Sequence, residues 1–268
     1  MRAVSALLIF SLVAFSQPAW AASGSVYLEE MTWTEVRDAI RANRTTILIP
    51  IGGTEQNGPH MPLGKHNVRV RALAGRIAAS LGTALVAPVV AYVPEGGVSP
   101  PTGHMRFAGT ISVPDDVFRN VLVAAARSFK QHGFVDVVLI GDSGNYQAQL
   151  KSVAARLNRD WARTRARAHY IEDYYRATQI GYAQALRARG LSEAQIGQHA
   201  GTADTSLLMA IDAALVRPEQ MDAAANEGTA GGTVGDPRAS SAALGAIGVD
   251  LIVAKTVAAI RSAEELRR

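Results

Sequence analysis

Short apolar runs rich in β-branched residues alternate with longer stretches of helical periodicity along most of the chain. The predicted strands are residues 45–51 (TTILIPI), 84–90 and 136–140 (DVVLI). The predicted helices are residues 33–43, 68–81, 114–132, a stretch beginning at Gln147, residues 207–214 and a terminal helix over 239–267. Alternation of this kind favours a mostly parallel sheet covered by helices on both faces. We therefore predict an α/β fold, a three-layer α-β-α domain.

The N-terminus has the pattern of an export signal. Arg2 precedes an apolar run over residues 3–15, and Ala19-Trp20-Ala21 supplies small residues at a cleavage site. The run is too short to span a bilayer comfortably, although an uncleaved anchor is the alternative. We expect a signal peptide over residues 1–21, one domain over 22–268 and a periplasmic or secreted protein. No later stretch is expected to be a membrane helix.

The composition excludes several classes of function. The chain has no cysteine, which rules out a thiol nucleophile, a thiolate zinc site and disulfides. Its net charge of +4 comes with a basic stretch at residues 151–167, but few aromatic residues and no nucleic-acid-binding motif accompany it. That stretch is typical of a solvated helix face, so no nucleic-acid partner is expected. A Gly-x-Ser-x-Gly elbow, a P-loop and a dinucleotide fingerprint are all missing from the sequence.

Polar, glycine-rich segments follow two of the predicted strands. Ligands in open α/β sheets bind beyond the carboxyl ends of the strands. The segment after the first strand holds Glu55, His60 and His66 within twelve residues. Carboxylate and neutral imidazole are the usual ligands of zinc, manganese or iron where cysteine is lacking. The segment indicates a metal site, although Glu55 as a turn cap and the histidines as polar loop residues remain an equal alternative.

Two further segments carry candidate groups. Asp142 follows the strand at 136–140 and could approach Glu55 at the same sheet edge, although a turn or cap aspartate is the plainer interpretation. His199 and Asp204 precede the predicted helix at 207–214, where Asp204 could simply cap its N-terminus.

Five segments, in order along the chain, resemble the creatininase (creatinine amidohydrolase) family. Residues 51–67 (IGGTEQNGPHMPLGKHN) are similar to its G-S-x-E-Q-H-G-P-H-L-P-L-x-T-D segment, and 104–112 (HMRFAGTIS) to H-x-x-F-P-G-T-x-S. Residues 139–145 (LIGDSGN) resemble N-G-H-G-G-N, 199–206 (HAGTADTS) resemble H-A-G-E-x-E-T-S, and 235–237 match G-D-P. The resemblance implies a creatininase-like three-layer fold and a metal-dependent hydrolase.

The resemblance also implies roles for individual positions, several of which have changed. Glu55 falls on a metal-binding glutamate and keeps its identity, whereas Asn57 falls on a ligand histidine, His66 on the metal-bridging aspartate, Asp142 on a ligand histidine and Asp204 on a ligand-region carboxylate. The expected metal ligands are therefore Glu55, His66 and Asp142, with Asp204. Because the second metal loses more of its ligands, we expect one divalent ion (Zn, Mn or Fe) per chain.

The resemblance implies an amidohydrolase that acts on a linear or cyclic amide, a C–N bond other than a peptide bond. His199 would carry a proton to the leaving nitrogen, and His60 would orient a ligand or the substrate. The alternative is a binding or structural protein that keeps the scaffold without activity, because the fold does not fix function. The partner expected is a small-molecule amide, without nucleic acid or membrane, and the family resemblance implies a homo-oligomer, a hexamer.

Overall fold

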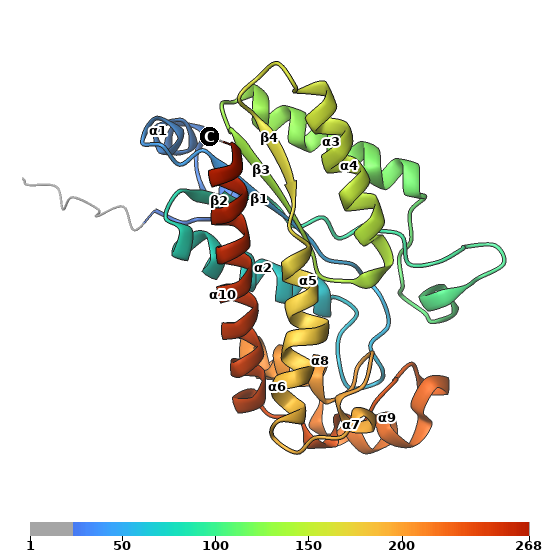
Figure 1. Ribbon diagram of the computed structural model, residues 1–268. Helices are drawn as coiled ribbons and strands as arrows, with labels where there is room; N and C mark the ends of the chain where they lie inside the picture. Colours follow the sequence, from blue (N-terminus) through green and yellow to red (C-terminus); the bar gives the residue numbers. More distant parts are fainter. Residues whose placement is uncertain (1–23, 268) are drawn as a thin grey trace, which may run out of the picture.

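The computed structural model describes residues 24–267. The predicted signal peptide at residues 1–21 lies outside the described residues. Four parallel strands form one sheet in the order β2-β1-β3-β4. The strands are β1 (Thr46–Ile51), β2 (Ala84–Val86), β3 (Asp136–Gly141) and β4 (Arg167–Tyr170). The described residues therefore confirm the predicted parallel sheet of a three-layer α/β fold (Figure 1).

The α-helices cover both faces of this sheet and extend beyond its carboxyl edge. They are α1 (Trp33–Arg41), α2 (Lys65–Leu81), α3 (Asp115–Gln131), α4 (Gln147–Asp160), α5 (Glu172–Arg176), α6 (Tyr182–Arg187), α7 (Glu193–Ile196), α8 (Thr202–Asp212), α9 (Met221–Glu227) and α10 (Ala242–Arg267). Figure 1 shows α3 and α4 on one side of the sheet, with α2 and α10 on the other. The helices α6 to α9 lie past the ends of the strands.

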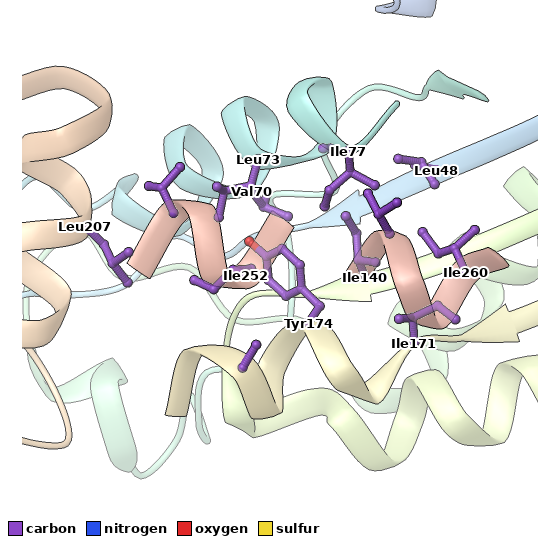
Figure 2. Packing of buried hydrophobic residues seen from close by; sticks show 14 of the residues in the cluster. Leu48, Val70, Leu73, Ile77, Ile140, Ile171, Tyr174, Leu207, Ile252 and Ile260 are labelled. Carbon is purple, nitrogen blue, oxygen red and sulfur yellow. The ribbon is translucent and has the colours of Figure 1, made fainter. Parts of the chain in front are cut away.

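Side chains alternate between the two faces of β1 and β3, as the period of a strand requires. Leu48 and Ile140 belong to the cluster that packs with Val70 and Leu73 of α2 and with Ile252 of α10 (Figure 2). The alternate positions form a second cluster with α3 and α4, whose members include Ile47, Ile49, Val137, Leu139, Phe118 and Leu150. Because both faces of the sheet are covered, these strands read as continuous apolar runs in the sequence.

The last helix corrects one expectation. By length and composition alone, α10 is able to cross a membrane, with a mean hydropathy of 1.9 over its most apolar window, of which 39% is buried. It nevertheless packs beside α2 and α8, and Val249, Ile252 and Ile260 are buried in the core. Its apolar composition is that of a helix within a packed domain.

Other differences lie at the ends of elements. The strand at Arg167–Tyr170 was not predicted, because its sequence (RAHY) continues a basic stretch and lacks an apolar run. It lies at the edge of the sheet, where only Ala168 of its four residues is buried. The helix α2 begins at Lys65, three residues earlier than predicted. Its first turn holds polar Lys65 and His66, which are buried but add nothing to the apolar pattern from which the helix was predicted. Its end at Leu81 agrees with the prediction, and the following residue, Gly82, adopts a left-handed conformation with φ of 77°.

Candidate active site

Strand register brings distant polar residues to one edge of the sheet. Ile51 at the end of β1 pairs with Gly141 at the end of β3, and the Asp142 amide donates to the Ile51 carbonyl (3.0 Å). The loop that carries Glu55 and the loop that carries Asp142 therefore start from the same place, as the strand-end argument predicted. A pocket of about 370 Å³ opens there.

Five segments supply the ionisable side chains around this pocket. We call Glu55, His104 and His199 the rim, and Lys65, His66, Arg69, Asp142 and Asp204 the floor; all eight line the pocket. The floor joins the start of α2 to the end of β3 and to the first turn of α8. The rim joins the loop after β1 to the glycine-rich loop at 94–109 and to the turn before α8.

The three expected ligands Glu55, His66 and Asp142 lie together, in direct contact. Nε2 of His66 is 2.8 Å from Oε1 of Glu55, and Nδ1 is 2.6 Å from Oδ2 of Asp142. The ring donates to both carboxylates at once only when both nitrogens carry protons. Nη2 of Arg69 also lies 3.3 Å from Nδ1 of His66, so the three expected ligands are engaged with one another and with Arg69.

Asp142 and Asp204 are engaged by basic side chains. Asp142 accepts from Nε of Arg69 (2.8 Å) and from the hydroxyl of Tyr174 (2.6 Å), in addition to His66. Asp204 accepts from Nη1 of Arg69 (2.7 Å) and from Nζ of Lys65 (3.1 Å). Burial raises the pKa of each aspartate, but these positive charges outweigh burial and hold both pKa values below their usual range.

The rim has the geometry of an open ligand set. One ligand atom each from Glu55, His104 and His199 lie within 4.8 Å of one another. Oε2 of Glu55 is 3.5 Å from Nε2 of His104, and Oε1 is 3.7 Å from Nδ1 of His199. Ligands about 2.1 Å from a tetrahedral zinc ion are separated by about 3.4 Å. Oε2 of Glu55 is buried and receives no hydrogen bond from an N–H group, and the Glu95 carboxyl is hydrogen-bonded to this glutamate. A cation at the rim would share the Glu55 carboxylate with Glu95.

Gln56 holds both imidazoles of the rim. Nε2 of His199 donates to the main-chain carbonyl of Gln56 (2.9 Å), which leaves the lone pair of Nδ1 facing Glu55. Nδ1 of His104 lies 3.1 Å from the Gln56 amide nitrogen, whereas the Gln56 amide oxygen accepts from Gly58 (3.0 Å). His104 therefore binds an ion through Nε2 only when its proton moves to Nδ1 and the Gln56 amide turns to accept it.

The electrostatics of the rim favour neutral imidazoles. Burial, and next the charge of Lys65, lower the pKa of His199 to about 4. Burial likewise lowers the pKa of His104. Burial alone would raise the pKa of Glu55, but the nearby charges of His66 and Lys65 hold it well below its usual range. At neutral pH the rim therefore presents one carboxylate and two neutral imidazoles, the forms that bind zinc or manganese.

Glu95 is a buried acid that the sequence did not single out. Its Oε2 accepts from the side-chain amide of Asn145 (2.6 Å), and Glu95 as a whole is 2% exposed. Burial, and next the charge of Glu55, raise its pKa to about 9, so Glu95 is a neutral carboxylic acid at neutral pH.

Two other predicted positions support loops. His60 is fully buried, lies 2.9 Å from the Thr205 hydroxyl through Nε2 and is not among the residues that line the pocket. Its contact joins the loop after β1 to α8. The Asn57 amide donates to the carbonyls of Glu55 (2.8 Å) and Pro62 (3.0 Å), which closes the turn that carries Glu55.

Sequence reasoning missed Lys65, Arg69 and His104 as site residues. Lys65 and Arg69 are four residues apart and share the helix face that carries Leu73, so helical periodicity marks both as buried. A buried basic pair of this kind requires acidic partners, which was the available signal. For His104 the available signal was its place as the histidine of the family-like segment 104–112, although only the loop fold brings it to Glu55.

The chain matches known proteins over most of its length. The family model described as creatininase (creatinine amidohydrolase) matches residues 29–260. The structure is similar to that of a creatinine amidohydrolase (creatininase), with a TM-score of 0.72, 23% identity and coverage of 89% of this chain and 97% of that one. A manganese creatininase also has a TM-score of 0.72, with 22% identity and coverage of 89% and 98%. These likenesses establish the fold.

Curated relatives are similar over shorter segments. A mycofactocin precursor peptide peptidase of Mycolicibacterium smegmatis is 34% identical over 113 residues, 40% of this chain and 43% of that protein. A 3-dehydro-scyllo-inosose hydrolase of Thermotoga maritima is 29% identical over 120 residues, 44% and 36% of the two chains. A creatinine amidohydrolase of Pseudomonas putida is 29% identical over 125 residues, 47% and 46%. Each alignment spans less than half of the relative. With the family model matched over residues 29–260, the chain belongs to the creatininase family.

Proposed function

We propose that the protein is an amidohydrolase that cleaves a small linear or cyclic amide with one divalent ion held at the rim. The observation that carries this proposal is the rim geometry, in which the buried Glu55 carboxylate has Nε2 of His104 at 3.5 Å from Oε2 and Nδ1 of His199 at 3.7 Å from Oε1. Zinc or manganese is the ion that we propose, because relatives of this fold include creatininases of the Zn-Zn and manganese types. When bound, such an ion acidifies a water molecule and polarises a carbonyl oxygen.

The residues of the pocket have distinct tasks in this proposal. Glu55, His104 and His199 hold the ion, and Gln56 orients both imidazoles. Lys65 lines the pocket, with Nζ 3.9 Å from Oε1 of Glu55, and in this proposal its positive charge stabilises the substrate carbonyl oxygen as it gains negative charge.

His199 cannot serve two roles at one atom. Nε2 is engaged with the Gln56 carbonyl, so Nδ1 is the only nitrogen free to bind an ion or to accept a proton. We propose the ligand role, in place of the proton carrier that the sequence suggested. A His199→Ala variant that loses the ion supports this assignment. A variant that keeps the ion at full occupancy and loses turnover would instead make His199 the proton carrier.

A small, polar amide is the substrate class that the pocket favours. A pocket of about 370 Å³ is at the lower end of the range for small-molecule sites. Side-chain amides of Gln56, Asn145, Gln179 and Gln198 line it, and they match the donors and acceptors of an amide or a lactam. The names of the relatives, which include a creatinine amidohydrolase and a peptide peptidase, are consistent with C–N bond hydrolysis.

The test is hydrolysis of a panel of lactams, hydantoins and formamides by protein loaded with Mn²⁺ or Zn²⁺. We expect turnover of at least one compound, its loss with a chelator and its return when the ion is restored. Glu219→Gln, on an exposed surface, is the matched control for Glu55→Gln. Turnover that persists in chelator, or in Glu55→Gln, would contradict the role of the ion.

A second candidate is a binding protein without activity. The observation that favours it is the direct pairing of His66 with Glu55 and Asp142, which leaves these residues engaged with one another. Under this alternative, a compound of the panel raises the melting temperature without being hydrolysed.

We also propose that the protein is exported and forms a homo-oligomer. The pattern of residues 1–21 supports export. N-terminal sequencing of protein from the periplasm, with a start near Ala22, tests export, and light scattering tests the oligomer. The expected subunit number is six, by family resemblance.

A further inference from the structure

The two aspartates of the floor have two permanently charged basic partners, Lys65 and Arg69, in addition to His66. Lys65 and Arg69 are 0% and 1% exposed, and Asp142 is 1% exposed. The Asp204 side chain is 13% exposed. Two buried carboxylates in a low-dielectric site require positive charge close by, which metal ions supply in many hydrolases. Here the positive charge belongs to the chain itself.

Arg69 bridges the two aspartates with separate nitrogens. Nε donates to Oδ2 of Asp142 (2.8 Å) and Nη1 donates to Oδ1 of Asp204 (2.7 Å). Its remaining nitrogen, Nη2, lies 3.4 Å from the Asp142 carbonyl. The planar guanidinium therefore fixes the end of β3 relative to the first turn of α8, as a shared ion would.

Lys65 occupies the space between Asp204 and the rim. Nζ is 3.1 Å from Oδ2 of Asp204 and 3.9 Å from Oε1 of Glu55. The Ala200 amide donates to the same Asp204 oxygen (3.0 Å). Both oxygens of Asp204 thus have cationic partners. In Asp142, Arg69 donates to Oδ2 and the Tyr174 hydroxyl donates to Oδ1 (2.6 Å).

A divalent ion does not fit the floor. It would have to displace hydrogen bonds from both aspartates and would lie beside two fixed positive charges in a medium of low dielectric constant. The rim differs, because Oε2 of Glu55 accepts no hydrogen bond from a lysine or arginine side chain.

We infer that Lys65 and Arg69 are built-in cations that take the place of a metal ion at Asp142 and Asp204. The floor then binds no divalent ion, and it assembles without one. This inference concerns the floor alone, so it holds whether or not the rim binds metal or supports hydrolysis.

Metal content after equilibrium dialysis against Mn²⁺, and separately Zn²⁺, tests the inference without measuring turnover. The proteins are the wild type, the rim variant His104→Ala/His199→Ala, the floor variant Lys65→Ala and the control Lys151→Ala, whose lysine is exposed on α4. We expect at most one equivalent in the wild type and in the control, and none in the rim variant. Lys65→Ala leaves Glu55 and Asp204 without their shared cation, and we expect it to gain one equivalent over the wild type.

Thermal unfolding supplies a second readout that does not depend on Lys65→Ala being folded. The rim variant should melt at the same temperature in chelator and in Mn²⁺, within about 1 °C, because the organic cations already stabilise the floor. Metal bound by the rim variant, or a large rise in its melting temperature with Mn²⁺, would overturn the inference. A folded Lys65→Ala protein without additional metal would also overturn it. A wild type that binds no metal would defeat the proposed function and leave the inference intact.

Discussion

The rim and the floor of the pocket both bring carboxylates and histidine together, but they differ in how fully the carboxylates are paired. On the floor, each aspartate oxygen accepts from a cation or a hydroxyl, and Arg69 spans two segments. On the rim, no N–H group donates to Oε2 of Glu55, and Nδ1 of His199 presents a free lone pair. A saturated cluster stabilises the fold, whereas an unsaturated cluster in a pocket is a place for a ligand. The presence of buried carboxylate and imidazole therefore does not by itself distinguish a structural site from a functional one.

The largest effect is expected on the stability of the protein, from a substitution that removes a cation from the floor. Arg69→Met removes the cation shared by Asp142 and Asp204 and leaves two buried carboxylates undercompensated. We expect the free energy of unfolding in urea to fall by about 3–5 kcal/mol. Arg156→Met, on the exposed face of α4, should change it by no more than about 0.5 kcal/mol. Equal changes in the two variants would show that the floor does not stabilise the fold.

The next effect is expected on the rim, in activity instead of stability. Glu55→Gln keeps the shape of the side chain and removes the charge that binds the ion. We expect kcat/KM for the amide substrate to fall about 100- to 1000-fold, since the ion contributes several kcal/mol to the transition state. The measurement is steady-state hydrolysis with Mn²⁺ in excess. A fall of less than tenfold would remove Glu55 from the ligand set.

A smaller effect is expected from the group that orients the rim. Gln56→Ala removes the side-chain amide that lies 3.1 Å from His104 and 3.2 Å from His199, and it keeps the main-chain carbonyl that accepts from His199. We expect the affinity for Mn²⁺ to fall about 10- to 100-fold, as for other residues that orient metal ligands. Calorimetric titration with Mn²⁺ measures this change. Gln179→Ala, which lines the same pocket, should leave the affinity as it is.

The smallest effect is expected in the response of the floor to acid. Burial opposes the ionisation of Asp204, yet Lys65 and Arg69 hold its pKa well below the usual range. A depressed pKa in the folded state gives a stabilisation that is present above the unfolded pKa of about 3.9 and is lost as pH falls through the folded value. The stability difference between the wild type and Asp204→Asn should therefore be constant from pH 7 to about 5 and shrink below about pH 4. Urea unfolding at a series of pH values measures it, and a constant difference down to pH 2 would contradict this account.

Most of the fold followed from local pattern. The runs at 45–51 and 136–140 are apolar throughout because their strands are covered on both faces, and they became β1 and β3. The helix α3 was predicted from Pro114, Asp115 and Asp116 at its start, where acidic side chains suit the helix dipole. The strand β4 escaped prediction, because an edge strand with alternating polar residues gives no apolar run.

The site was predicted in its location and only partly in its membership. The strand-end rule placed Glu55 and Asp142 at one edge, and the segment from 51 to 67 pointed to His66. Nothing in the local sequence showed that Arg69 would pair with Asp142 or that His104 would approach Glu55. Those contacts join residues that are 73 and 49 positions apart, respectively, so no periodicity along the chain reports them.

The sequence by itself determined the layers, the strand ends and the family, because these depend on hydrophobic period and on short segments that keep their spacing. The tertiary structure alone decided which carboxylates are paired and which one is left open. That decision depends on burial and on the positions of Lys65 and Arg69 relative to Asp204, which are properties of the packed chain. Charge compensation in an interior is settled only when distant segments meet, because each buried charge takes its partner from whatever the fold brings within reach.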